Sequence, residues 1–283
     1  LLCTTAEASP GATSQMRLVQ RLEGQDLIQL KKGTSEAEPL TLSFWVKSNV
    51  TGTYVINAQD FDNTRLFSQE YSIASSGVWE KKIIVIPADT VGVLDNDNNN
   101  SLFFNFFLGA GSDRTSGSLQ TSWAASVTAN FAPGQTNLAA STSNYWQVTG
   151  VQLEVGEVAT PFEHKPFGVE LAECQRYFER IAEPGDASAV AVCQAISTTV
   201  AVGTLRFSKK RTNPSFSFAD AGDFRVRSAT NTYLTCTSLP FAEIGTASVT
   251  LIPTVASGLV QGNATEMLFD GDAAGFLDVS AEL

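Results

Sequence analysis

The sequence lacks the residues and segments on which several classes of protein depend. Its 283 residues include one histidine and four cysteines, and the cysteines stand far apart with no C-x-x-C spacing. This arrangement argues against a zinc site and against a disulfide framework, and it favours buried free thiols. No run of about 18 apolar residues is present, so no membrane-spanning helix is expected. We therefore predict no metal, no cofactor and no membrane insertion.

Positive charge is also scarce. The chain has 18 lysines and arginines against 29 aspartates and glutamates, which gives a formal net charge of −11. Because an acidic chain repels phosphate backbones, nucleic acid is not an expected partner. The longest basic cluster, Lys209-Lys210-Arg211, is predicted to be a solvated turn.

Short catalytic motifs are absent as well. There is neither a Gly-x-Ser-x-Gly sequence nor a Walker loop, and Gly109-Ala-Gly111 lacks the third glycine of a dinucleotide fingerprint. The single histidine, His164, is predicted to pack or cap rather than to catalyse, since no convincing nucleophile and acid accompany it. Paired carboxylates of a glycosidase would leave no short motif, so they stay open as an alternative. The carboxylates available for such a pair are Asp60, Asp62, Glu70, Asp89, Asp113, Glu154 and Glu163. We predict that the protein is not an enzyme.

The acidic stretch from Asp95 to Asn100 imitates the start of a calcium-binding loop. Oxygen ligands occupy positions one, three and five, but position six is Asn100 instead of glycine and position twelve is Phe106 instead of glutamate. The stretch is therefore no EF-hand. A looser calcium site in a β-sandwich stays open, and a solvated turn of Asx residues is the favoured interpretation.

What the chain does contain is a period-two alternation of apolar and polar residues. In Leu40–Lys47, Leu40, Leu42, Phe44 and Val46 share one face. Further strands are expected at 54–59, 79–86, 102–108 and 145–155, with turn-forming clusters between them. Short strands without intervening helices predict an antiparallel β-sandwich over residues 1–165.

One segment departs from this alternation. From Val169 to Ile181 the residues are good helix formers, and Leu171, Cys174, Phe178 and Ile181 recur at spacings of three and four. We predict a short helix there, within a helical joint at 166–186. Strand patterns resume beyond it and predict a second, smaller β-domain over 187–283.

Several stretches resemble a recurrent module of bacteriophage tail-fibre proteins. The most specific is the sequence from Gly150 to Gly168, which runs on into Glu170–Glu179. A second match lies in Val19–Gly24, Lys32–Ser35 and Leu40–Ser48, and residues 78–87 fit the strand that follows. The match is good from about Met16 to Arg180.

This resemblance implies a jelly-roll domain like that of carbohydrate-binding modules, followed by a distal β-domain. It also implies a virion protein of the phage tail, made in the host cytoplasm, that forms a homotrimer and recognises a host-surface glycan or receptor. The family has no fixed catalytic set to carry over. The opening residues, Leu1-Leu2-Cys3-Thr4, read as a strand, so we expect the jelly roll to lack its leading strands. Other tail or baseplate proteins are expected to bind through the missing N-terminal region.

The aromatic residues give the candidate sites. Trp45 and Lys47 lie opposite the apolar stripe of their strand, and Asn105 and Phe107 occupy the alternate face of 102–108. Rings beside amide and amino groups suit sugar recognition, and such a face also suits packing against loops or another subunit, which is the favoured interpretation. Leu171, Cys174, Phe178 and Ile181 are the candidate trimer interface.

Three functions follow from this pattern. The first is a tail-fibre component that attaches the virion to the host without catalysis. The alternatives are a carbohydrate-binding module of a secreted bacterial protein and a purely structural fibre or baseplate spacer. For the first, the loops at 228–232 and 257–263 of the C-terminal domain are the preferred host contact, with the Trp45 face as an accessory sugar site.

Overall fold

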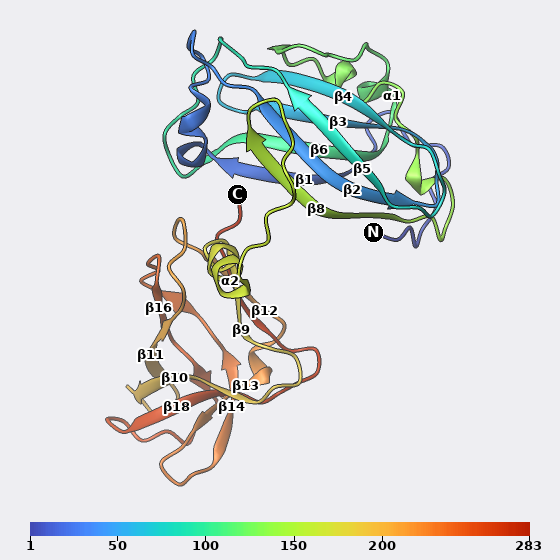
Figure 1. Ribbon diagram of the computed structural model, residues 1–283. Helices are drawn as coiled ribbons and strands as arrows, with labels where there is room; N and C mark the ends of the chain where they lie inside the picture. Colours follow the sequence, from blue (N-terminus) through green and yellow to red (C-terminus); the bar gives the residue numbers. More distant parts are fainter. The chain divides into compact units, whose positions relative to one another are not determined.

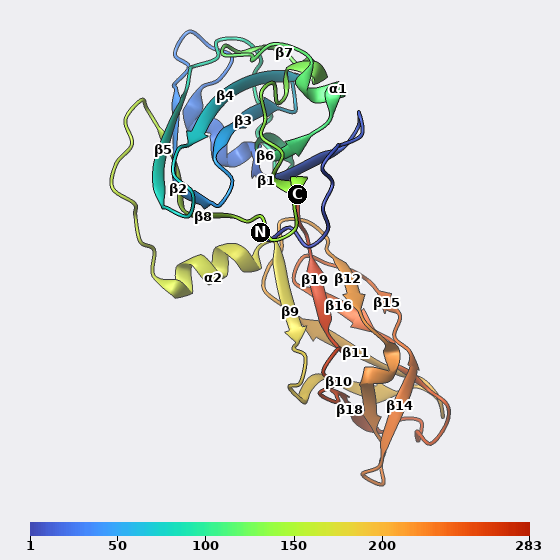
Figure 2. The ribbon, with the colours of Figure 1, turned by 90° about the vertical axis from the view of Figure 1, so that its right-hand side faces the viewer.

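The computed structural model describes all residues from 1 to 283 and confirms an all-β fold of antiparallel sheets. The chain divides into two compact units, Leu1–His164 (which also takes in Leu283) and Lys165–Glu282. Figures 1 and 2 show the strands of each unit, which are described separately below. The segment expected as a helical joint at 166–186 belongs to the second unit.

The first unit is a sandwich of two antiparallel sheets (Figure 2). The strands of the five-stranded sheet, in spatial order, are β1 (Gln15–Glu23), β6 (Asn100–Ala110), β3 (Gly52–Asp60), β4 (Arg65–Ile73) and β7 (Ala124–Ala125). Those of the three-stranded sheet are β5 (Glu80–Ile86), β2 (Leu40–Ser48) and β8 (Trp146–Val155). Along the chain, the strands cross between the sheets after β1, β2, β4, β5 and β7, which is typical of a jelly roll.

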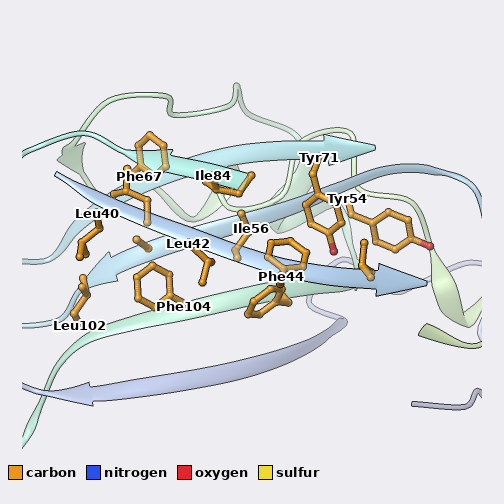
Figure 3. Close-up of a cluster of buried hydrophobic side chains, with 14 of the residues drawn as sticks. Leu40, Leu42, Phe44, Tyr54, Ile56, Phe67, Tyr71, Ile84, Leu102 and Phe104 are labelled. Atoms are coloured by element: carbon orange, nitrogen blue, oxygen red, sulfur yellow. The ribbon is translucent and has the colours of Figure 1, made fainter. Parts of the chain in front are cut away.

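The core of this unit lies between the two sheets, as the alternation predicts. Leu42, Phe44 and Val46 of β2 point inward and are almost fully buried. Figure 3 shows Phe44 among aromatic neighbours, and its ring meets those of Tyr71 and Phe106 edge-on at centroid distances of 5.3 and 5.2 Å. Edge-on ring pairs of this kind add specific geometry to the burial of apolar area.

A buried ion-pair cluster ties loops of the sandwich together. Lys32 donates from Nζ to the Asp60 carboxylate and lies 3.0 Å from Asp89 Oδ2. It also donates to the carbonyl oxygens of Val91 and Gly92, and Arg65 holds Asp89 with two hydrogen bonds of 2.7 and 2.9 Å. Burial raises the pKa of Asp89, but the hydrogen bonds from Arg65 and Lys32 outweigh it and hold that pKa below its ordinary value.

The second unit is also built from antiparallel strands. Its larger sheet has the order β15-β16-β11-β10-β18-β13-β14-β17, and its smaller sheet has the order β12-β19-β9. The larger sheet comprises Phe241–Ala242, Ser248–Leu251, Ala201–Arg206, Ser188–Ala195, Ala264–Phe269, Phe224–Arg227, Tyr233–Ser238 and Thr254–Val255, in that order. The smaller comprises Ser215–Phe218, Leu277–Ser280 and Phe178–Ala182. Phe224, Met267 and Leu277 are among its fully buried side chains.

The predicted helix over Val169–Ile181 is wrong in its C-terminal part. The helix α2 spans Phe167–Gln175, and the chain then enters β9, where Ser280 pairs with Phe178 and Asp278 with Arg180. Arg180 also donates two hydrogen bonds to the Asp278 carboxylate, at 2.6 and 2.8 Å. These tertiary contacts override the local helix propensity.

The predicted solvated turn at Lys209-Lys210-Arg211 is also wrong. Lys210 is only 1% exposed, and its Nζ donates to the Gln175 carbonyl oxygen at 2.6 Å and to Glu179 Oε2 at 3.0 Å. Arg211 donates from Nε to the Ala281 carbonyl oxygen. The cluster therefore ends α2 and fixes β9 within its own unit, and only Lys209 faces solvent.

Candidate functional site

The outer face of the three-stranded sheet β5-β2-β8 presents side chains in a regular register. Across β2, Trp45 pairs with Lys81 of β5 and with Thr149 of β8, and Lys47 pairs with Gln147 of β8. Successive strand residues point to opposite sides of a sheet, so these side chains all lie opposite the core. We call Trp45, Lys47, Trp79, Lys81, Gln147 and Thr149 the aromatic face.

Two tryptophans are the largest side chains of the aromatic face. Trp45 is 42% exposed, and Trp79, immediately before β5, is 40% exposed. Lys47 lies with Nζ 5.5 Å from the centre of the Trp79 ring, which is the geometry of a cation–π contact. Trp79 could have been found from the sequence, because the alternation that buries Ile84 and Ile86 turns the odd-numbered positions of this strand outward.

A shallow hollow of about 420 Å³ borders the aromatic face. Trp79, Gln147 and Thr149 contribute to it from the face itself. Its remaining lining is apolar and consists of Leu1, Trp146, Val148 and Leu18, the last of which belongs to β1 of the other sheet. A hollow with one half-exposed ring, an amide and a hydroxyl offers stacking and hydrogen-bonding groups side by side.

The segment that follows β8 packs onto the outer side of the same sheet. Gln152 accepts from the backbone N–H of Glu163 at 2.7 Å, and Glu154 accepts from the backbone N–H of Thr160 at 3.1 Å. A Cβ added at Gly150 would lie 3.5 Å from the Trp45 ring and 3.8 Å from the Phe162 ring, which are ordinary contact distances and place both rings beside this position. Glycine is favoured here because its φ is +57°. The stretch that carries the resemblance to tail fibres thus borders the aromatic face.

Asn105 and Phe107 do not join Trp45 and Lys47, and their grouping as one exposed surface is wrong. Both belong to β6 of the other sheet, and both are 0% exposed. Phe107 packs with Val55 and Ala132 under the loops of residues 111–140. Asn105 donates to Asn57 Oδ1 at 2.7 Å and accepts from Arg17 Nη1 at 2.8 Å. Their role is structural, because loops cover the outer face of the five-stranded sheet and bury both side chains.

Of the carboxylates considered for catalysis, the structure brings Asp60 and Asp89 together, and both are held by the buried Lys32 ammonium group. His164 is exposed, and its ring meets that of Phe162 edge-on at 5.0 Å. No group of three or more histidine, cysteine, aspartate or glutamate residues is arranged to hold a metal ion. In the loop from Asp95 to Asn100, Asp97 Oδ1 accepts from the Asn99 backbone N–H, as in an Asx turn.

The candidate trimer residues do not form one helical stripe. Leu171 and Cys174 are exposed on α2, whereas Phe178 and Ile181 lie on the strand β9. Positions three apart on a strand point to opposite faces, so Phe178 is half-exposed while Ile181 packs against the core of its unit. The spacing of three and four therefore misled the prediction.

Of the four free cysteines, two fit the expectation of buried thiols. Cys193 and Cys236 are buried, while Cys174 is exposed and Cys3 is partly exposed. Burial raises the pKa of Cys193 to about 11 and, with a smaller effect of Cys193, that of Cys236 to about 12. Burial and a raised pKa both disfavour the thiolate, which is the reactive form of a cysteine.

The loops of the second unit named as a host contact gather at one end of its larger sheet. The turn at 228–232 joins β13 to β14, and the loop at 257–263 leads into β18. The backbone N–H of Leu259 donates to the Thr198 carbonyl oxygen, which brings the β10–β11 turn to the same end. A Cβ at Gly258 would lie 3.2 Å from the Leu234 side chain of β14. Hydroxyl and amide side chains dominate these loops.

Comparison with known proteins adds no family: no protein-family model matches the chain, and no curated protein sequence matches it. Among the helices, none is long and apolar enough to span a membrane. The evidence on function therefore comes from the residues and geometry of the chain itself.

Proposed function

We propose that this chain is a non-enzymatic attachment component of a bacteriophage tail fibre, and that it binds glycan on the host surface through the aromatic face. The observation that carries the proposal is the pair of half-exposed tryptophans, Trp45 and Trp79, on a sheet whose opposite side is fully packed. Rings fixed on a rigid sheet stack against the apolar side of a sugar at little entropic cost.

Polar groups beside the rings complete what a sugar site needs. Gln147 and Thr149 line the hollow next to Trp79, where they can bind sugar hydroxyls. The hollow is shallow, which suits a part of a long polysaccharide better than an enclosed small molecule. Weak single contacts are sufficient when several copies bind together.

The exposed helix α2 supports the fibre part of the proposal. The nine-residue helix α2 has no buried residue, and Phe167 on it is 78% exposed. Helices this short are marginal in water without packing partners. We propose that Phe167 and Leu171 pack against copies of the chain in a homotrimer. Light scattering should report three chains, and Leu171→Glu should reduce the mass toward one; a monomeric native chain at micromolar concentration contradicts the homotrimer.

The loop end of the second unit is a second surface for host contact. The turns at 196–200 and 228–232 and the loop at 257–263 lie together there and are rich in small polar residues. Exposed loops on a rigid sheet are common places for binding. The loop end also has one exposed ring, that of Tyr233, which is 50% exposed with the Arg227 guanidinium 5.5 Å from its centre. The aromatic face takes precedence here because it holds two exposed tryptophan rings on one sheet.

The proposal is tested by attachment of the fluorescently labelled chain to a panel of bacterial strains. We expect binding to some strains, loss of that binding after periodate oxidation of cell-surface sugars, and loss with the Trp45→Ala/Trp79→Ala double variant. Binding that survives both treatments would assign attachment to protein or to the loop end. Absence of binding to every strain would favour the structural spacer.

A monomer that binds polysaccharide would instead favour the carbohydrate-binding module of a secreted bacterial protein. Mass and binding are therefore measured on the same preparation. The two readouts separate all three functions, because only the fibre protein is expected to be both trimeric and glycan-binding.

A further inference from the structure

The aromatic face carries positive charge on a strongly acidic chain. Lys81 lies directly across from Trp45 in the register of β2 and β5, and Lys47 lies over the Trp79 ring. Each tryptophan therefore has a lysine as a neighbour on the sheet, although the whole chain has a net charge of −11.

Neither of these lysines is neutralised by an ion pair. Elsewhere in the same unit lysines are paired, as Lys82 is with Glu80 at 2.7 Å and Lys32 with Asp89 at 3.0 Å. Lys47 and Lys81 have no such partner within 4.0 Å. The three strands turn one carboxylate outward, that of Glu154, and the Thr160 hydroxyl and backbone N–H bind it.

Distance separates that carboxylate from the rings. Glu154 pairs with Thr41, four residues along β2 from Trp45. A strand rises about 3.3 Å per residue, so the two positions are roughly 13 Å apart along the sheet. The Debye length at physiological ionic strength is about 8 Å, and remote acidic groups of the chain are screened further.

Hydrogen bonds from Thr160 and Gln152 lower the pKa of Glu154, and the charge of Lys81 adds to this effect, so Glu154 offsets part of the Lys81 charge. Lys47 has no ion pair that offsets its charge in this way.

Building on the proposed function, we propose that the ligand of the aromatic face is an acidic glycan, whose sugar rings stack on Trp45 and Trp79 while its carboxylate or phosphate groups meet Lys81 and Lys47. A neutral glycan would leave Lys47 without a counter-charge and Lys81 with only the partial counter-charge of Glu154. An acidic glycan satisfies them and is oriented along the sheet by the two charges, which stand next to different rings.

The test uses polymers that differ in charge alone. Polygalacturonate and its fully methyl-esterified form share one backbone, and pairs of acidic bacterial polysaccharides with their carboxyl-reduced forms extend the panel. We expect the native chain to bind acidic members more tightly than their neutral partners, with an advantage that shrinks as salt is raised. Lys47→Gln and Lys81→Gln should each weaken acidic binding about threefold, the size of an exposed charge pair.

Lys209→Gln is the matched control, because it removes one exposed lysine of the other unit and changes the net charge equally. It should leave binding unchanged. Neutral members bound as tightly as acidic ones, with no effect of Lys47→Gln and Lys81→Gln, would overturn the acidic-glycan inference and leave the proposed function standing. Binding to no member of any pair would overturn both.

A second measurement reads the charge at the rings without any glycan. Iodide and caesium ions quench exposed tryptophan fluorescence, and a Trp45→Phe/Trp79→Phe variant supplies the background from Trp123 and Trp146. After this subtraction, iodide should quench more strongly than caesium, and Lys47→Gln/Lys81→Gln should reverse the order. Stronger quenching by caesium in the native chain would contradict the local positive field.

Discussion

The two sheets of the first unit are built from similar strands, but the outer face of one is covered by loops and the outer face of the other is partly exposed. On β6, Phe107 and Asn105 are fully buried under loops, while on β2 Trp45 and Lys47 remain accessible. Both strands alternate in the same way, and both place aromatic and polar side chains opposite the core. The difference comes from residues 111–140, which cover the five-stranded sheet. An aromatic residue on the outer side of a strand is thus core or binding surface according to what the loops do.

Among the paired variants, Phe107→Ala on the covered sheet and Trp45→Ala on the aromatic face should differ most in the free energy of unfolding. Removing the buried Phe107 ring should lower the free energy of unfolding by about 4 kcal/mol, because it leaves a cavity among Val55 and Ala132. Trp45→Ala removes a half-exposed ring and should cost about 1 kcal/mol or less. Urea denaturation of the first unit measures both. Equal losses would mean that the two faces are alike.

Two lysines allow the same comparison between a buried position and an accessible one. Lys32→Met should destabilise the unit by about 3 kcal/mol, because Asp89 keeps Arg65 while the buried Asp60 carboxylate loses its cation. Lys47→Met on the aromatic face should change stability by less than about 0.5 kcal/mol. Thermal unfolding of the two variants compares them directly. A Lys32 variant as stable as the native chain would contradict the importance of the cluster.

Polar groups should follow the same rule with a smaller effect. Asn105→Ala deprives Asn57 Oδ1 of its donor and Arg17 of its acceptor, and should cost about 2 kcal/mol. Gln147→Ala on the aromatic face should leave stability unchanged and weaken glycan binding. If instead Gln147→Ala destabilises the fold and leaves binding intact, its assignment to the aromatic face is wrong.

The smallest expected effect is a pH dependence. The pKa of Asp89 is depressed in the folded chain, so its unfolded form takes up protons first as the pH falls. The stabilising contribution is therefore fully present above the unfolded value of about 3.9 and is lost as the pH falls through the lower folded pKa. Acid titration of stability should show a shallower slope for Asp89→Asn than for the native chain. Identical slopes would contradict the depressed pKa.

Strand positions were predictable where alternation was regular. The patterns at 40–47, 54–59, 79–86, 102–108 and 145–155 correspond to β2, β3, β5, β6 and β8. The strands β1 and β4 were not anticipated, because polar residues such as Gln20, Arg21, Gln69 and Glu70 interrupt their apolar content. Those side chains are tolerated at strand positions that face solvent or lie near a sheet edge.

Residues 176–182 show why the end of the helix predicted over 169–181 could not be placed correctly from the sequence. Local propensity favours a helix through Ile181, yet the pairing of β9 with β19 joins residues about 98 positions apart, as for Arg180 and Asp278. The buried position of Lys210 likewise depends on Glu179 and on the end of α2. Contacts of such sequence separation leave no local signal.

Part of the candidate site could be predicted, because alternation shows which residues of a strand point outward. Trp45 and Lys47 follow from alternation within one strand, and Trp79 and Lys81 follow from the same rule on β5. Joining them required the register between β2 and β5, which the sequence does not reveal. Asn105 and Phe107 were assigned to the site because the loops that cover them have no periodic pattern.

The central claim is that the aromatic face of the sheet β5-β2-β8 binds glycan through its two tryptophans. The most direct measurement is an array of bacterial surface polysaccharides probed with the native chain and with Trp45→Ala/Trp79→Ala, after circular dichroism has shown both to be folded. The account predicts that the native chain binds a subset of acidic polysaccharides and that the double variant loses at least tenfold in affinity for them, about 1.4 kcal/mol. Undiminished binding by the folded double variant would contradict it.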